Sequence, residues 1–268
     1  ENFSFGGEYA SKINDPSADN GFIYKSGDAL LLMTGYSTKG FSLRANAKRV
    51  DNMSFRSDRN AGINDLLINY LPALSKQHTY SLLAFYPYAS QPNGELAFET
   101  ELNYKIKKDT KLGGPYGTEI SINFSGANSL DTTQLNDMSG ERKGYKSDYF
   151  SPGKDVYFRD FVFEVSRKFN KKVKATFEYA TQVFNIAVVR GKAGQPNIYA
   201  NIIVTDVTYK MTSDKAIRVE LQHLSTQALT YSFRADDGNW AFGLVECTLG
   251  SNWFVAIQDQ YNYGYSKS

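Results

Sequence analysis

The sequence lacks several features that identify common protein classes. Its single cysteine, Cys247, excludes an intrachain disulfide framework and a cysteine-based zinc site. Proline is scarce, with 7 residues. The longest purely apolar run, Ala29 to Met33, is far below the roughly 18 residues of a transmembrane helix. Neither sign of charge dominates, with 30 basic and 28 acidic residues, so nothing points to nucleic acid or to an acidic partner.

Strand-forming residues are abundant instead. Aromatic residues make up 15% of the chain, with 19 Tyr and 18 Phe, and such residues favour strands over helices. The mean hydropathy is low, which argues against a helical membrane protein. It does not argue against a membrane β-barrel, because half of each barrel strand faces a polar lumen.

The dominant pattern is a two-residue alternation in segments of about ten residues, which is typical of spanning barrel strands. The clearest example runs from Leu96 to Ile106, where apolar side chains alternate with Glu99, Glu101 and Lys105. Similar alternation covers residues 41–48, 118–126, 173–181 and 217–223. Ten residues tilted by about 45° cover roughly 24 Å, which is close to the apolar band of an outer-membrane barrel.

The connections between these segments alternate in length, as they do between the two rims of a membrane barrel. Short turns are expected at 38–40, 72–77, 107–111, 168–172, 211–215 and 249–252. Longer loops are expected at 51–62, 87–94, 127–155, 185–197 and 226–238. This order requires Ile63 to Leu71 to be a strand, although Leu66, Leu67 and Ile68 are consecutive. The sequence thus predicts an all-β, antiparallel up-and-down transmembrane barrel of about thirteen strands in a single domain over residues 1–268.

Some strands have an unclear phase. Ala29 to Tyr36 is apolar on both faces, and Trp240 to Leu249 places Glu246 in phase with large apolar residues. Such strands face a partner or a plug, or their faces are assigned incorrectly here.

The ends of the chain carry expectations of their own. Bacterial single-chain barrels have even strand numbers, so the odd count predicts a larger barrel of which both ends are incomplete here. The chain opens at Glu1 without a basic n-region or an apolar h-region, so a signal peptide was either removed or never present.

Several motifs carry a family resemblance. They are the runs Lys48 to Arg56, Asn69 to Tyr80, Tyr86-Pro87-Tyr88, Gln91 to Glu95 and Gly238 to Phe242. Together they resemble a family of uncharacterised outer-membrane β-barrel proteins typical of the Bacteroidetes. The resemblance implies a barrel fold, an outer-membrane location and further strands after the point that matches Tyr263. It implies no activity, catalytic residue or cofactor.

The polar face of the strands is the main candidate site. Its acidic and basic residues nearly balance, which favours cross-strand ion pairs over a pore that selects one sign of ion. The candidate lumen-lining residues are Arg44, Lys48, Glu99, Glu101, Lys105, Glu119, Asp160, Glu164, Lys174, Glu178, Asp206, Arg218 and Glu220. The long loop 127–155 is a second candidate, because a loop of this size folds into a barrel, covers it, or contacts an external partner or lipopolysaccharide.

Other chemistry has little support. The two histidines, His78 and His223, lie on separate expected strands, so no metal site is predicted. The Asp- and Asn-rich loops 14–20 and 131–137 lack EF-hand spacing. His223 and Ser225 share the lipid-facing side, but same-face neighbours lie roughly 7 Å apart, too far for a catalytic hydrogen bond.

The favoured function is therefore a non-enzymatic protein of the bacterial outer membrane. It acts as a porin-like channel or as the membrane component of an envelope complex, without a cofactor. Its expected partners are outer-membrane lipid and lipopolysaccharide, with other envelope proteins as a further possibility and nucleic acid excluded. Two alternatives remain open: a soluble all-β protein that binds carbohydrate or another ligand, and a lipid-cleaving barrel enzyme that uses His223.

Overall fold

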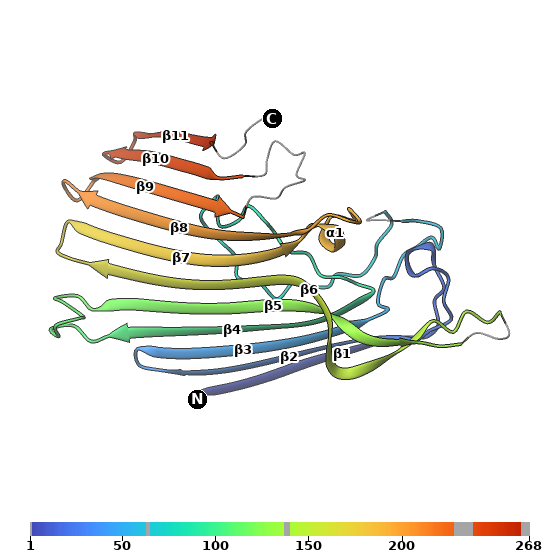
Figure 1. Cartoon of the computed structure of the whole chain (residues 1–268). Coiled ribbons are helices and arrows are strands. Elements are labelled where there is room, and N and C mark those ends of the chain that lie inside the picture. Colours follow the sequence, from blue (N-terminus) through green and yellow to red (C-terminus); the bar gives the residue numbers. More distant parts are fainter. Residues whose placement is uncertain (1, 63–64, 137–139, 228–237, 264–268) are drawn as a thin grey trace.

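A single antiparallel sheet organises the protein. The computed structural model describes residues 2–62, 65–136, 140–227 and 238–263. Eleven strands lie side by side in sequence order, each hydrogen-bonded to the next along the chain (Figure 1). They are β1 (Phe3–Lys12), β2 (Gly27–Thr38), β3 (Phe41–Asp51), β4 (Gly94–Ile106), β5 (Thr118–Gln134), β6 (Tyr145–Lys168), β7 (Val173–Asn185), β8 (Asn197–Lys210), β9 (Lys215–Thr226), β10 (Trp240–Leu249) and β11 (Phe254–Asn262). The predicted all-β antiparallel meander is confirmed.

The alternation along each strand gives the sheet two different faces. In β4, Glu95, Ala97 and Glu99 are buried on one face, which we call the inner face. Register carries this face across the sheet, because Glu99 lies opposite Ser125, and Ser125 opposite Asp160. Every second residue points to the opposite, outer face.

The sheet does not close on itself within the described residues. β1 pairs only with β2, and β11 pairs only with β10. The strands number eleven instead of the expected thirteen, and the difference lies entirely between β3 and β4.

The two expected strands between β3 and β4 are not formed. Residues 65–71 contain no strand beyond an isolated bridge between Arg56 and Leu67, and residues 63–64 lie outside the described part of the chain. Residues 78–86 are likewise irregular and lie against the inner face. The consecutive apolar residues here cannot alternate between two faces, and the prolines at 72, 87 and 92 cannot donate ladder hydrogen bonds. Because two strands are lost together, the other connections stay at the ends of the sheet where the sequence places them.

The expected loop 127–155 is also largely strand. β5 continues to Gln134 and β6 begins at Tyr145, so the two form a hairpin that projects past the neighbouring strands (Figure 1). The pairing shifts register between Ala127 and Thr132. These irregularities bend the hairpin, as β-bulges do.

Helical structure is minor. A 3-10 turn covers Ala18–Asn20, and the four-residue helix α1 (Ile186–Val189) begins the connection from β7 to β8. Among the described residues, no helix is both long and apolar enough to span a bilayer.

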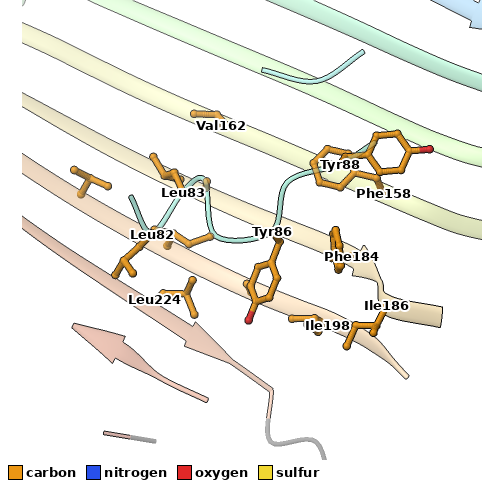
Figure 2. Close-up of a cluster of buried hydrophobic side chains, with 14 of the residues drawn as sticks. Leu82, Leu83, Tyr86, Tyr88, Phe158, Val162, Phe184, Ile186, Ile198 and Leu224 are labelled. Carbon is orange, nitrogen blue, oxygen red and sulfur yellow. The ribbon is translucent and has the colours of Figure 1, made fainter. Parts of the chain in front are cut away.

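The hydrophobic core lies on the inner face, between the sheet and the chain that connects β3 to β4. Leu82, Leu83, Tyr86 and Tyr88 of this connection point toward apolar side chains of the sheet (Figure 2). Those side chains are Phe158, Val162, Phe184, Ile198, Ile202, Val204 and Leu224. The Tyr88 ring stacks on Phe158 with 5.0 Å between centroids, which is an offset aromatic pair of ordinary geometry.

We expect the substitution Leu82→Ala to lower the free energy of unfolding by about 2–5 kcal/mol, because it removes a fully buried side chain and leaves a cavity. Urea unfolding followed by tryptophan fluorescence measures the change. The matched control is Leu112→Ala on an exposed turn, where the same deletion should have little effect. Equal effects of the two substitutions would contradict the position of the core.

Candidate functional site

The candidate site is the part of the inner face that holds residues 72–93, which we call the inner segment. It contains no helix or strand, and beyond a turn at residues 80–85 it is held by partners outside itself. The sheet supplies those partners from β3, β4, β6, β7, β8 and β9.

Lys48 of β3 forms the first anchor. Its ammonium lies 2.9 Å from the Glu95 carboxylate of β4 and donates hydrogen bonds to the Pro72 carbonyl and the Ser90 hydroxyl. The Lys48 and Glu95 side chains are 3% and 0% exposed, so this is a fully buried ion pair. A buried ion pair offsets its desolvation only if further hydrogen bonds satisfy both groups. The two ends of the inner segment supply those hydrogen bonds.

Glu95 also holds the far end of the inner segment. Its carboxylate accepts a hydrogen bond from the Tyr88 hydroxyl and one from the backbone N–H of Gln91, at 2.8 Å. Burial, together with the adjacent Glu95 charge, raises the pKa of the Tyr88 hydroxyl well above its ordinary value. The phenol therefore stays protonated and remains a donor.

Asp160 of β6 forms the second anchor, with no exposed surface. Its carboxylate lies 2.7 Å from Nε2 of His78. On the next strand, the Gln182 side-chain amide donates to the Leu83 carbonyl at 3.0 Å. The middle of the inner segment is thus held by one charged group and one neutral group of adjacent strands.

Gln222 of β9 forms the third anchor. Its side-chain oxygen accepts a hydrogen bond from the Leu82 backbone N–H at 2.8 Å, and its side-chain nitrogen donates to the Ser81 hydroxyl at 3.2 Å. The Tyr80 hydroxyl donates to Asp206 of β8 at 3.3 Å. Burial and the negative charge of Asp206 raise the pKa of Tyr80.

Lys76 joins the inner segment to two acidic residues of the sheet. Its ammonium lies 3.6 Å from both Glu164 of β6 and Glu178 of β7. Five of the residues predicted to line a lumen thus contact the inner segment directly. They are Lys48, Asp160, Glu164, Glu178 and Asp206.

The remaining candidates lie on the same face. The cross-strand ion pairs that balanced charge predicts are present between Arg44 and Glu101 and between Lys105 and Glu119. Arg218 lies close to three carboxylates, those of Asp206, Glu220 and Glu246. Glu99 accepts hydrogen bonds from the side chains of Asn46 and Asn123. Lys174 is exposed near the start of β7.

A second buried polar cluster lies at the long-loop end and was not predicted. Asp51, at the end of β3, is 1% exposed and accepts hydrogen bonds from Lys25, Tyr145 and Ser147 at 2.6–2.7 Å. Arg49 lies 3.0 Å from the same carboxylate. The cluster ties the part of β6 next to the turn of the β5–β6 hairpin to the end of β3 and to the β1–β2 connection. Loop residues this far apart in sequence give no local signal of such contacts.

The apolar half of the inner face was also missed. Ile198, Ile202 and Val204 of β8 and Leu224 of β9 are buried beneath the inner segment. β8 carries apolar side chains on both faces, which is the signal that a second layer covers the inner one. In β10, Glu246 in phase with large apolar residues left a partner, a plug or a wrongly assigned phase open, and Phe242 and Leu244 of this strand belong to the core.

The outer face carries the two residues considered for lipid cleavage, His223 and Ser225. His223 of β9 points outward, and its Nε2 contacts the Tyr263 hydroxyl. The Ser225 hydroxyl donates to the Asn201 carbonyl at 3.4 Å. The structure therefore does not bring His223 and Ser225 together as an acid–base pair. In the described residues, no three His, Cys, Asp or Glu side chains lie where they would hold a metal ion.

Taken together, these features define an all-β protein whose single antiparallel sheet holds its own connecting chain on one face. The chain belongs to a family of unknown function, DUF6029, which matches residues 1–268. None of the curated proteins matches it. Among solved structures, it is similar to OmpT, an outer membrane protein of Vibrio cholerae that was folded in vitro. The identity is 9% and the TM-score 0.35, over 99% of this chain and 88% of that one.

Removing one member of the buried anchor should destabilise the protein strongly. We expect Glu95→Gln to lower the free energy of unfolding by about 3–5 kcal/mol, because it leaves the Lys48 ammonium buried without a countercharge. The matched control is Glu119→Gln, whose ion pair with Lys105 is mostly exposed and should contribute less than about 1 kcal/mol. Chemical unfolding measures both. A similar decrease in the free energy of unfolding in the two variants would show that the buried Lys48–Glu95 pair contributes no more to stability than an exposed pair.

Proposed function

We propose that the protein is a non-enzymatic outer-membrane β-barrel protein whose lumen contains the inner segment. In this role it acts as a largely closed channel or as the membrane component of an envelope complex. The observation that carries the proposal is the chemistry of the outer face. Large apolar side chains are exposed there on β5, β7, β8, β9 and β10: Phe124, Phe177, Ile203, Leu221 and Val245, between 40% and 58%.

An exposed face of this kind requires an apolar environment. Soluble monomers rarely expose contiguous apolar patches larger than a few hundred Å². Phe177, Ile203 and Leu221 point outward from β7, β8 and β9, while neighbouring residues such as Glu178 and Gln222 are buried polar groups on the inner face. Apolar outside and polar inside is the arrangement of a membrane barrel wall.

The strand lengths support the same proposal. β4 has 13 residues and β8 has 14, and about 9–11 tilted residues suffice to cross a bilayer. Aromatic residues Tyr36, Phe41, Tyr104 and Tyr209 lie at the short-turn ends of β2, β3, β4 and β8. Aromatic rings at strand ends suit the headgroup level of a membrane.

The inner segment favours a closed channel over an open pore. It covers the inner face of β6 to β9 with apolar side chains and fixes them with buried polar anchors. The end of the sheet near the short turns is left more open, and the Arg44–Glu101 and Lys105–Glu119 pairs lie there. A lumen arranged in this way passes solutes only when the inner segment moves.

The membrane proposal predicts the effect of a charge on the outer face. Leu221→Arg places a charge near the middle of β9, on the outer face. In a bilayer this costs about 2–4 kcal/mol, so the yield of refolding into phospholipid vesicles should fall strongly. Leu112→Arg on an exposed turn should refold as the parent protein does. If the parent protein instead stays in solution without detergent or lipid, the proposal is wrong and a soluble binding protein is favoured.

The closed-channel proposal predicts the effect of loosening the inner segment. The parent protein should show little conductance in planar bilayers. The triple substitution Lys76→Ala, His78→Ala and Tyr80→Ala removes contacts to Glu164, Asp160 and Asp206. It should produce larger and more frequent conductance steps.

The control for this experiment changes the neighbours that face away from the sheet. Gln77, Thr79 and Ala84 are exposed, and Gln77→Ala, Thr79→Ala and Ala84→Ser should leave conductance unchanged. Large steps from the parent protein would contradict closure. Silence from both variants would favour a scaffold in an envelope complex over a channel.

A further inference from the structure

The short turns carry a concentration of positive charge that the inner site does not use. We define the basic collar as the six turn lysines Lys39, Lys107, Lys108, Lys111, Lys171 and Lys172. All six are exposed, and the same turns contain only two acidic residues, Asp109 and Asp214. Because the net charge of the whole chain is only +2, the collar is a local feature and not a consequence of composition.

The collar is largely free of internal neutralisation. In the described part of the chain, Lys108 is its one member within 4.0 Å of a carboxylate, that of Asp109. Lysines at the ends of adjacent strands, Lys168, Lys210 and Lys215, extend the positive charge along this end of the sheet. Unpaired like charges repel one another. Their concentration at one end therefore favours an anionic partner.

The opposite end of the sheet differs. Its charged residues occur in both signs, and several are paired at close range, as in Lys25–Asp51, Arg49–Asp28 and Arg56–Asp19. The two ends of the strands therefore differ: charges of both signs occur at the long-loop end, whereas lysine predominates at the short-turn end.

The collar lies just beyond the aromatic residues of the outer face. Lys39 is three residues from Tyr36, and Lys107 is three residues from Tyr104. Three residues of strand cover roughly 10 Å at most, which is close to the Debye length at physiological salt. Rings at the headgroup level therefore place these ammonium groups within reach of lipid phosphates.

We propose that the basic collar binds the phosphate groups of anionic phospholipids in the leaflet at the short-turn end. This inference rests on the proposed membrane function and deepens it. In bacterial barrels the short turns face the periplasm, so the lipids concerned are those of the periplasmic leaflet. Flexible lysines on separate turns suit a mobile anionic surface.

The test measures lipid preference of the refolded full chain. The protein in mild detergent is mixed with equal amounts of phosphatidylglycerol and phosphatidylcholine, and bound lipids are counted by native mass spectrometry. The parent protein should retain phosphatidylglycerol at least about tenfold over phosphatidylcholine, and the preference should fall as salt rises. Changing the six collar lysines to Gln should reduce the ratio toward one.

The matched control neutralises lysines at the opposite end. Lys146, Lys154 and Lys192 are also exposed, and their change to Gln should preserve the lipid preference. Loss of preference in the control, or no preference in the parent protein, overturns the proposal. If the collar variant instead loses binding to soluble polyglutamate while keeping its lipid ratio, the collar serves an acidic protein partner and the lipid proposal is wrong.

Failure of the collar is distinguishable from failure of the membrane function. A parent protein that refolds into vesicles of pure phosphatidylcholine and pure phosphatidylglycerol equally well, without lipid preference, disproves the collar alone. A parent protein that enters neither kind of vesicle disproves the membrane function itself.

Discussion

The buried contact between Lys48 and Glu95 is the constraint on which the inner layer depends. The two residues stand on neighbouring strands at the points where the chain leaves the sheet and returns to it. A charge pair removed from water must be surrounded by further donors and acceptors to be tolerated. The inner segment provides them through Pro72, Tyr88, Ser90 and Gln91. The pair therefore fixes both ends of an irregular chain that has no secondary structure of its own.

The packing of the rest of the inner segment depends on these fixed ends. Once its ends are held, the segment can place Leu82 and Leu83 against Ile202, Val204 and Leu224, and this burial supplies most of the driving force. The polar anchors at Asp160, Gln182 and Gln222 then determine which residue meets which strand, because apolar contact alone is not directional. Apolar contacts therefore hold the inner segment against the sheet, while polar contacts determine which of its residues meets which strand.

The sequence predicts this arrangement unevenly, for physical reasons. A strand such as Leu96 to Ile106 is recognisable because its two faces meet different surroundings, so apolar and polar side chains alternate along the sequence. Asp160 and Glu178 were found as inner-face residues by the same phase. Their partners His78 and Lys76 are not predictable, because an irregular segment has no period that gives the direction of its side chains. Ile63 to Leu71 was assigned to the sheet on the order of turns alone, although three consecutive apolar residues argue for contact without alternation.

The position of the inner segment in the chain has a consequence for how the protein assembles. The connection that contains it leaves from β3 and returns to β4, two paired neighbours, at the same rim of the sheet. It is thus a loop folded inward from one opening, and no chain end has to be threaded through the strands to install it. All eleven strands can pair first, and the loop can enter and leave afterwards as a unit while the hydrogen-bonded wall stays intact.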